Sequence, residues 1–328
     1  MSYNNRMITR RHFVSGSAAA LALAVGRASA MTGPVSRKLR KNRTVRFAHM
    51  TDIHVEPKRC ASEGLTAALK HVHTLKDRPD MIITGGDNIM DCLGADDNWT
   101  NIQFELFKDT FAKHCIIPVK HCIGNHDVWG WDKEKSKTTG NESLWGKRRV
   151  VRELNLPNRY YGFDKDHWRI IILDSTYPDE SVYTARLDDE QFEWLEQQLD
   201  TYKKSHVCII SHIPVLSVAT FLDGDNEKSG RWTLPDEWMH LDARKIKNLF
   251  LKHPNVRLCI SGHMHMVDRL IYNDVTYICD GAVSGAWWKG NHYEFDEGYG
   301  LFDLYDDGTF DHQYVAYGWQ PKDNCDEL

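Results

Sequence analysis

Five short segments of this chain carry the side chains that bind metal ions in proteins. Each contains aspartate, asparagine or histidine and directly follows a short apolar run. The segments are Asp52-Ile53-His54, Gly86-Asp87, Gly124-Asn125-His126-Asp127, His212 and Gly262-His263-Met264-His265. If the fold brings these segments together, their carboxylate, amide and imidazole groups predict one metal site.

The apolar runs before these segments predict the strands that position them. The runs are Val45–Met50, Met81–Thr84, Cys115–Val119, Val207–Ile210 and Val256–Ile260. Short apolar runs without strict alternation, separated by helix-like stretches, are typical of buried parallel strands. Because the carboxyl ends of parallel strands share one edge of a sheet, we expect the five segments to converge there.

The number of ligands predicts two metal ions. Two carboxylates, one amide and four imidazoles exceed the needs of one four-coordinate zinc ion and suit a pair that shares a bridging carboxylate, for which Asp87 is the candidate. Two divalent ions carry four positive charges and two carboxylates remove two, so the site favours an anion such as phosphate. Ions about 3.5 to 4 Å apart would activate a bridging water for in-line displacement. The predicted reaction is phosphoester hydrolysis.

The ordered motifs D-x-H, G-D, G-N-H-D, H and G-H-x-H resemble those of the calcineurin-like metallophosphoesterases, from about Val45 to Gly318. This resemblance implies an α/β fold, a four-layer α/β/β/α sandwich of two mixed sheets flanked by helices. It implies two divalent or mixed-valence ions drawn from Mn, Fe, Zn and Ni. It assigns one ion to Asp52, His54, Asp87 and His265, and the other to Asp87, Asn125, His212 and His263.

The same resemblance implies that His126 is not a ligand but the acid that hydrogen-bonds the phosphoryl or leaving-group oxygen. An imidazole titrates near neutral pH and can donate a proton there. Asp127, or alternatively Asp91, is the candidate carboxylate that orients His126. The predicted catalytic residues are therefore His126 and Asp127.

The sequence differs from two groups of these metallophosphoesterases, and the differences narrow the resemblance to one branch. Met90 stands where purple acid phosphatases carry a metal-binding tyrosine, and Asp127 stands where serine/threonine protein phosphatases carry glutamate. The pattern resembles the bacterial cyclic-nucleotide phosphodiesterase and small-phosphoester branch, so we expect hydrolysis of small phosphodiesters or phosphomonoesters by metal-bound hydroxide attack at phosphorus. An exported nuclease or phospholipase C-like phosphodiesterase is the alternative, supported only by the basic stretch Arg37–Arg43. A non-enzymatic scaffold is disfavoured because the ligand set is complete.

Residues 1–30 have the layout of a twin-arginine signal peptide. Arg10-Arg11 precedes an apolar stretch of small residues, and Ala28-Ser29-Ala30 resembles a peptidase site. This layout predicts export by the twin-arginine machinery to the periplasm or the extracellular space. Removing the leader deletes four arginines and no acidic residue, which takes the formal charge from −5 to −9. Its apolar core is too short for a membrane span, and no nucleic-acid-binding surface is evident.

The remaining chain is expected to form one domain. Residues 31–43 read as a basic linker, residues 44–320 as the metallophosphoesterase domain and residues 321–328 as a C-terminal tail. The turn Asp306-Asp307-Gly308 among short strand runs predicts antiparallel strands near the end. Helices are predicted at Ser62–Lys76, Trp99–Lys113, Glu142–Leu154, Asp188–Lys204 and Asp242–Lys252.

Aromatic residues near the motifs are candidates for substrate contacts. They are Trp129, Trp131, Trp287 and Trp288. Such rings could form walls beside a metal site, and packing of the loops is the equally weighted alternative. The 216–237 segment after His212 has loop composition and is a candidate lid.

The eight cysteines are expected to be mostly free thiols. Cys208 and Cys259, for example, lie inside apolar runs as small buried hydrophobes do. Exported proteins can form disulfides, but a protein that folds before twin-arginine export has less need of them. Cys60, Cys92 and Cys325 are left open.

Overall fold

The computed structural model describes residues 41–322 and Cys325, and its strands form two large mixed sheets and one short hairpin. The hairpin pairs β6 (Thr176–Asp179) with β7 (Val182–Ala185). The first sheet contains, in spatial order, β13 (Phe310–Ala316), β12 (Gly298–Tyr305), β1 (Arg43–Met50), β2 (Met81–Thr84) and β3 (Val119–His121). The second contains β10 (Asp268–Tyr272), β11 (Val275–Cys279), β9 (Val256–Ser261), β8 (His206–Ile210), β5 (Trp168–Ile172) and β4 (Tyr161–Lys165).

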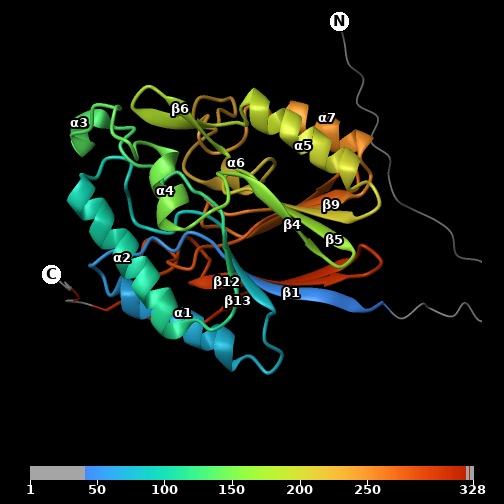
Figure 1. Cartoon of the computed structure of the whole chain (residues 1–328), viewed down its shortest axis with the longest axis horizontal. Coiled ribbons are helices and arrows are strands. Elements are labelled where there is room, and N and C mark those ends of the chain that lie inside the picture. Colours follow the sequence, from blue (N-terminus) through green and yellow to red (C-terminus); the bar gives the residue numbers. More distant parts are fainter. Residues whose placement is uncertain (1–40, 323–324, 326–328) are drawn as a thin grey trace, which may run out of the picture. The chain divides into compact units, whose positions relative to one another are not determined.

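Helices cover the outer face of each sheet, which confirms the predicted four-layer sandwich (Figure 1). α1 and α2 pack on the first sheet, and α5 and α7 pack on the second. The helices of the described residues are α1 (Ala61–Thr74), α2 (Asp97–His114), α3 (Lys133–Ser136), α4 (Lys147–Glu153), α5 (Asp189–Thr201), α6 (Ala219–Leu222) and α7 (Ala243–Lys252).

Successive side chains along a strand point to opposite faces of the sheet, and this alternation explains the layers. On β1, Phe47 packs in the core between the two sheets, whereas Ala48 belongs to the core beneath α1 and α2. On β5, Ile170 joins the central core and Ile171 joins the core beneath α5 and α7. Strands that are apolar on both faces are therefore buried on both sides, as parallel strands covered by helices must be.

Three predicted elements differ from the structure. The five motif-bearing strands do not share one sheet, because β1, β2 and β3 lie in the first and β8 and β9 in the second. The predicted strand Cys115–Val119 is displaced, since the Cys115 N–H bonds Phe111 O at the end of α2 and pairing with β2 begins only at Val119. The predicted helix Glu142–Leu154 begins only at Lys147, after Gly146 adopts a φ of 71°.

The ends of the chain fall largely outside the described residues. The predicted leader (1–30) and most of the basic linker (31–43) lie there, while Arg43 is part of β1. Of the predicted tail (321–328), Lys322 pairs with Glu63, and Cys325 forms a disulfide with Cys60 at the start of α1. No helix within residues 41–322 is long and apolar enough to cross a membrane.

Candidate metal centre

All seven predicted ligands meet where the loops after β1, β2, β3, β8 and β9 converge. The ligand atoms of Asp52, His54 and His265 lie within 4.8 Å of one another. The same holds for Asp87, His212 and His263. The seventh residue, Asn125, places Oδ1 3.0 Å from His212 Nε2. The structure therefore brings the ligands together in the two predicted groups.

Asp87 lies between the two groups. Its Oδ2 is 3.2 Å from His212 Nε2 and 3.7 Å from His54 Nε2. Its Oδ1 accepts a hydrogen bond of 2.8 Å from the backbone N–H of His126. Burial alone would raise the pKa of Asp87, but the neighbouring histidines, His212 first, hold it well below the ordinary value. A charged carboxylate that faces both groups is what a bridging ligand requires.

The backbone of these loops is held in an uncommon conformation. Asp52, His54, Asp87, His263 and His265 all have positive φ angles, between 47° and 71°. Non-glycine residues seldom adopt this region, and such strain concentrates at functional sites. The loops support one another, because Asp52 N–H bonds Gly86 O and His54 N–H bonds Asp87 O.

Two glycines of the motifs are required by close approach to the ligands. A Cβ atom on Gly124 would lie 2.1 Å from Asp87 Oδ1, and one on Gly262 would lie 2.3 Å from Asp52 Oδ2. Both separations are shorter than any tolerated contact with a rigid neighbour. The glycines before Asn125 and His263 therefore make room for the carboxylates.

Backbone carbonyls orient two of the ligand histidines. His212 Nδ1 lies 2.9 Å from Gly85 O, and His265 Nδ1 lies 2.6 Å from Gly285 O. In each case Nδ1–H donates, so the Nε2 lone pair is left for a metal ion. Burial lowers the pKa of His263 to about 3 and keeps that imidazole neutral.

The donor set fits two metal ions. His54 Nε2 and His265 Nε2 lie only 3.1 Å apart, and the buried Asp52 Oδ1 makes no hydrogen bond with the described residues. Facing lone pairs and an orphaned carboxylate oxygen are costly unless a cation lies among them. Mixed nitrogen and oxygen donors suit Mn, Fe, Zn or Ni. The residues present are therefore compatible with the predicted pair.

The side chain of His126 stands beside the ligands, while its backbone N–H holds Asp87 Oδ1. Its ring lies edge to face with that of His54, with centroids 4.8 Å apart, and its side chain is 32% exposed. His126 Nδ1 lies 3.8 Å from Asp91 Oδ1. A partly exposed imidazole next to the metal centre is accessible to a substrate.

Asp127 faces away from His126. Its carboxylate accepts hydrogen bonds from Asn88 N–H at 2.9 Å and from Gly124 N–H at 2.9 Å. Burial and the charge of Asp87 raise the pKa of Asp127 to about 7. These contacts give Asp127 a role in holding two motif loops together. Asp91 Oδ1 lies beside His126 Nδ1, but at 3.8 Å it makes no hydrogen bond to it.

Three of the four tryptophan candidates are buried. Trp129, Trp131 and Trp288 are at most 5% exposed. Trp129 Nε1 donates to Ala95 O, and Trp288 Nε1 donates to His54 O. Because they pack in the core, these three cannot form substrate walls as predicted. Trp287 is partly exposed, and its ring centroid lies 4.5 Å from that of His265.

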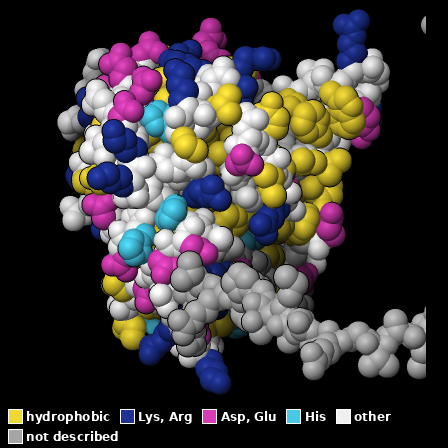
Figure 2. Space-filling model, turned by 90° about the vertical axis from the view of Figure 1, so that its right-hand side faces the viewer, with side chains coloured by type: hydrophobic (Ala, Val, Ile, Leu, Met, Phe, Trp, Pro, Cys, Tyr) yellow, Lys and Arg dark blue, Asp and Glu magenta, His cyan; other side chains and the backbone are white. Residues whose placement is uncertain are grey.

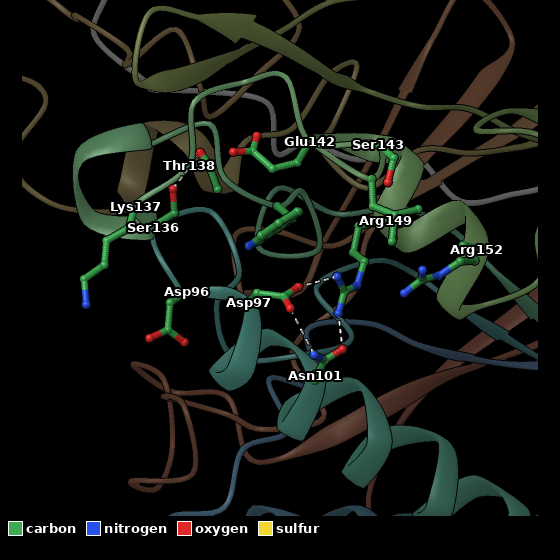
Figure 3. Close-up of a pocket in the computed structure, with 12 residues that line it drawn as sticks. Asp96, Asp97, Asn101, Ser136, Lys137, Thr138, Glu142, Ser143, Arg149 and Arg152 are labelled. Atoms are coloured by element: carbon green, nitrogen blue, oxygen red, sulfur yellow. Dashed lines mark hydrogen bonds and ion pairs between the residues drawn. The ribbon is translucent and has the colours of Figure 1, made fainter.

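Trp129 instead lines a separate cavity of about 600 Å³ at the start of α2 (Figure 3). Arg149 reaches into this region, and its guanidinium pairs with Asp97 at 2.7 Å and bonds Asn101. The same group lies over the Trp129 ring. None of the predicted metal ligands lines the cavity, so we assign it no part in the reaction.

Sequence reasoning missed His292 and Tyr293. The His292 ring lies 5.5 Å from that of His265 and 5.8 Å from that of Trp287. The Tyr293 hydroxyl donates to Asp223 Oδ1 at 2.9 Å. This bond links the loop that carries Trp287 and His292 to the 216–237 segment. Neither residue belongs to a recognisable motif, and only their nearness to Trp287 in sequence could have indicated them.

The surface shows mixed charge on the face drawn in Figure 2. Basic and acidic side chains are interspersed there, and hydrophobic side chains gather toward its upper right. On this face the described residues form no continuous basic track of the kind that follows a nucleic-acid backbone.

Comparison with known proteins identifies the family. The sequence model of calcineurin-like phosphoesterases matches residues 45–267. The chain therefore belongs to the calcineurin-like phosphoesterase family, and it is a metal-dependent phosphoric ester hydrolase. The family uses a dinuclear metal centre, which agrees with the two groups of ligands.

Two relatives match most of the chain. A probable glycerophosphodiester phosphodiesterase GpdQ of Arcobacter nitrofigilis is 28% identical over 223 residues, which cover 68% of this chain and 70% of the relative. A 3',5'-cyclic-nucleotide phosphodiesterase of Nostoc sp. is 24% identical over 280 residues, which cover 81% of this chain and 90% of the relative.

A solved structure supports the fold. The dimetal phosphatase from Danio rerio matches with a TM-score of 0.57 and 15% identity, over 84% of this chain and 98% of that one.

Proposed function

We propose that this chain hydrolyses small phosphodiesters, with small phosphomonoesters as a second substrate class. The carrying observation is that Asp87 faces both ligand groups while His126 stands partly exposed beside them. The two matched relatives named as phosphodiesterases support the diester preference. When bound, two divalent ions would neutralise phosphate charge and activate a water.

The protein's own residues divide the remaining work. We assign His126 the donation of a proton to the leaving oxygen, with support from its Nε2, which lies 4.0 Å from Asp87 Oδ2 on the side of the metal centre. Trp287 and His292 form an aromatic wall next to His265, suited to a flat leaving group. Asp87 holds the two ligand groups in one unit.

A substrate panel tests the proposal. Purified protein would be assayed with bis-p-nitrophenyl phosphate, p-nitrophenyl phosphate, cyclic AMP and glycerophosphodiesters, each with Mn, Zn, Fe and Ni. We expect metal-dependent turnover with the diesters ahead of the monoester. Absence of turnover on every diester with every metal would contradict the proposed function.

Two variants separate the roles of the site residues. Asp87→Ala is expected to lose both metal ions and activity, because the bridge holds the pair together. His126→Ala is expected to keep its metal content while kcat falls by about 10² to 10⁴, the range for a lost general acid. Elemental analysis and kinetics decide this, and loss of metal from the His126 variant would overturn its role as acid.

We also propose that the protein is exported through the twin-arginine route. The support is the Arg10-Arg11 pair followed by a weakly apolar stretch and Ala28-Ser29-Ala30. Replacing both arginines with lysine should leave the precursor in the cytoplasm, and the mature protein should begin at Met31. Normal periplasmic accumulation of the double variant would refute this route and leave the hydrolase assignment unaffected.

A further inference from the structure

The β6–β7 hairpin brings one tyrosine to the metal centre. The ring of Tyr183, on β7, meets the ring of His263 edge to face, with centroids 6.3 Å apart and planes at 80°. Its side chain also packs against the core beneath α1 and α2. Hydrogen bonds from Thr184 Oγ1 and Ala185 N–H to Asp236 O fix the strand directly after Tyr183. Tyr183 is therefore held beside a ligand by contacts on several sides.

The hydroxyl of Tyr183 has no hydrogen-bond partner among residues 41–322. Three of the other partly buried tyrosines each donate to a backbone carbonyl, whereas Tyr177 and Tyr202 resemble Tyr183 in having no such bond within the described part of the chain. The three bonds run from Tyr161 to His121 O, from Tyr314 to Asp296 O and from Tyr317 to Val283 O, at 2.6 to 2.8 Å. The donor of Tyr183 is thus available for a ligand that enters the site.

A tyrosine hydroxyl can donate a hydrogen bond to a phosphoryl oxygen, but a neutral phenol is a poor base and a poor nucleophile.

We propose that the Tyr183 hydroxyl binds a non-bridging oxygen of the substrate phosphoryl group at the His263 side of the centre, while His126 serves the leaving oxygen at the His54 side. A donor fixed in place before the reaction stabilises charge that develops on such an oxygen. This inference rests on the proposed function and adds Tyr183 to its catalytic residues. It also gives the hairpin a reason to lie over the site.

Tyr183→Phe tests the inference because it removes only the hydroxyl. Metal-loaded protein should bind inorganic phosphate about 10- to 100-fold more weakly, the range for one lost hydrogen bond to a charged group. The kcat/KM for bis-p-nitrophenyl phosphate should fall by a similar factor. Metal content and melting temperature should not change.

Tyr177→Phe is the matched control. Tyr177 lies on β6, pairs with Thr184 of the same hairpin and stacks with Arg186. This variant loses a hydroxyl from the same hairpin but not beside His263, so it should behave as the wild type in every assay.

The possible outcomes separate this inference from the proposed function. Unchanged phosphate affinity in Tyr183→Phe would overturn the inference, and so would a loss of metal or a lower melting temperature than that of Tyr177→Phe. If the wild type hydrolyses no diester, the proposed function fails, yet weaker phosphate binding by Tyr183→Phe would still support the hydrogen bond. A wild type that hydrolyses diesters but does not bind phosphate would refute the inference and leave the proposed function standing.

Discussion

Two adjacent tryptophans are expected to respond in opposite ways to the same substitution. Trp288 is 1% exposed, its indole lies directly over Gly64, and its Nε1 donates to His54 O at 3.0 Å. Trp287 is partly exposed and packs against His265, with the two ring planes tilted by 37°. Truncating Trp288 therefore leaves an internal cavity, whereas truncating Trp287 opens a gap to solvent.

The structure sets the size of each effect. Trp288→Ala should cost about 3 to 5 kcal/mol of unfolding free energy, the range for a buried tryptophan. At about 2 to 4 °C per kcal/mol for a domain of this size, the melting temperature should fall by roughly 6 to 20 °C. Trp287→Ala should cost about 0.5 kcal/mol, as partly exposed positions usually do.

The kinetics should also distinguish the two variants, because only Trp287→Ala should discriminate between substrates. Trp287→Ala should lower kcat/KM by about 10- to 100-fold on an aromatic diester, by analogy with bases stacked on aromatic rings, and little on a small aliphatic diester. Trp288→Ala should affect both substrates alike, because it disturbs the backbone at His54.

Thermal melts of the metal-loaded variants and kinetics with both diesters decide the comparison. Equal falls in melting temperature for the two variants would refute the distinction. Equal losses on both substrates for Trp287→Ala would refute its role as a substrate wall.

Two further predictions follow from packing and burial. Gly64→Ala places a Cβ 2.1 Å from Trp288 Cζ3, so overpacking should cost about 1 to 3 kcal/mol and lower the melting temperature, and an unchanged melt would contradict the packing described. Burial lowers the pKa of His121 from 6.5 to about 4. The unfolded chain therefore takes up this proton first as the pH falls, and about 2 to 3 kcal/mol of stability should be lost between those two pH values. Melts from pH 7 to 4.5 should show a smaller loss for His121→Leu than for the wild type, and equal losses would refute the assignment.

The metal centre was largely predictable because metal-binding residue types recur along the sequence in a recognisable order, each after an apolar run. Two carboxylates, one amide and four imidazoles after apolar runs indicated seven ligands, and the structure places all seven in two groups. The division of the strands between two sheets was not predictable, because β2 and β8 are both short and apolar and nothing local distinguishes their sheets.

Residues outside the motifs were harder to place. Trp287 and Trp288 are neighbours in sequence, yet one faces the centre and the other the core, because both adopt positive φ angles that a sequence pattern does not reveal. Tyr183 reaches His263 only through the fold of a hairpin. The disulfide joins Cys60 to Cys325 across 265 residues, and spacing alone cannot select such a pair.

The central claim is that one carboxylate, Asp87, joins two metal ions held by two groups of ligands. Anomalous diffraction from crystals of the metal-loaded protein tests this most directly. We expect two peaks, both within bonding distance of Asp87, one beside Asp52, His54 and His265 and the other beside Asn125, His212 and His263. A single peak, or two peaks of which only one contacts Asp87, would contradict the account.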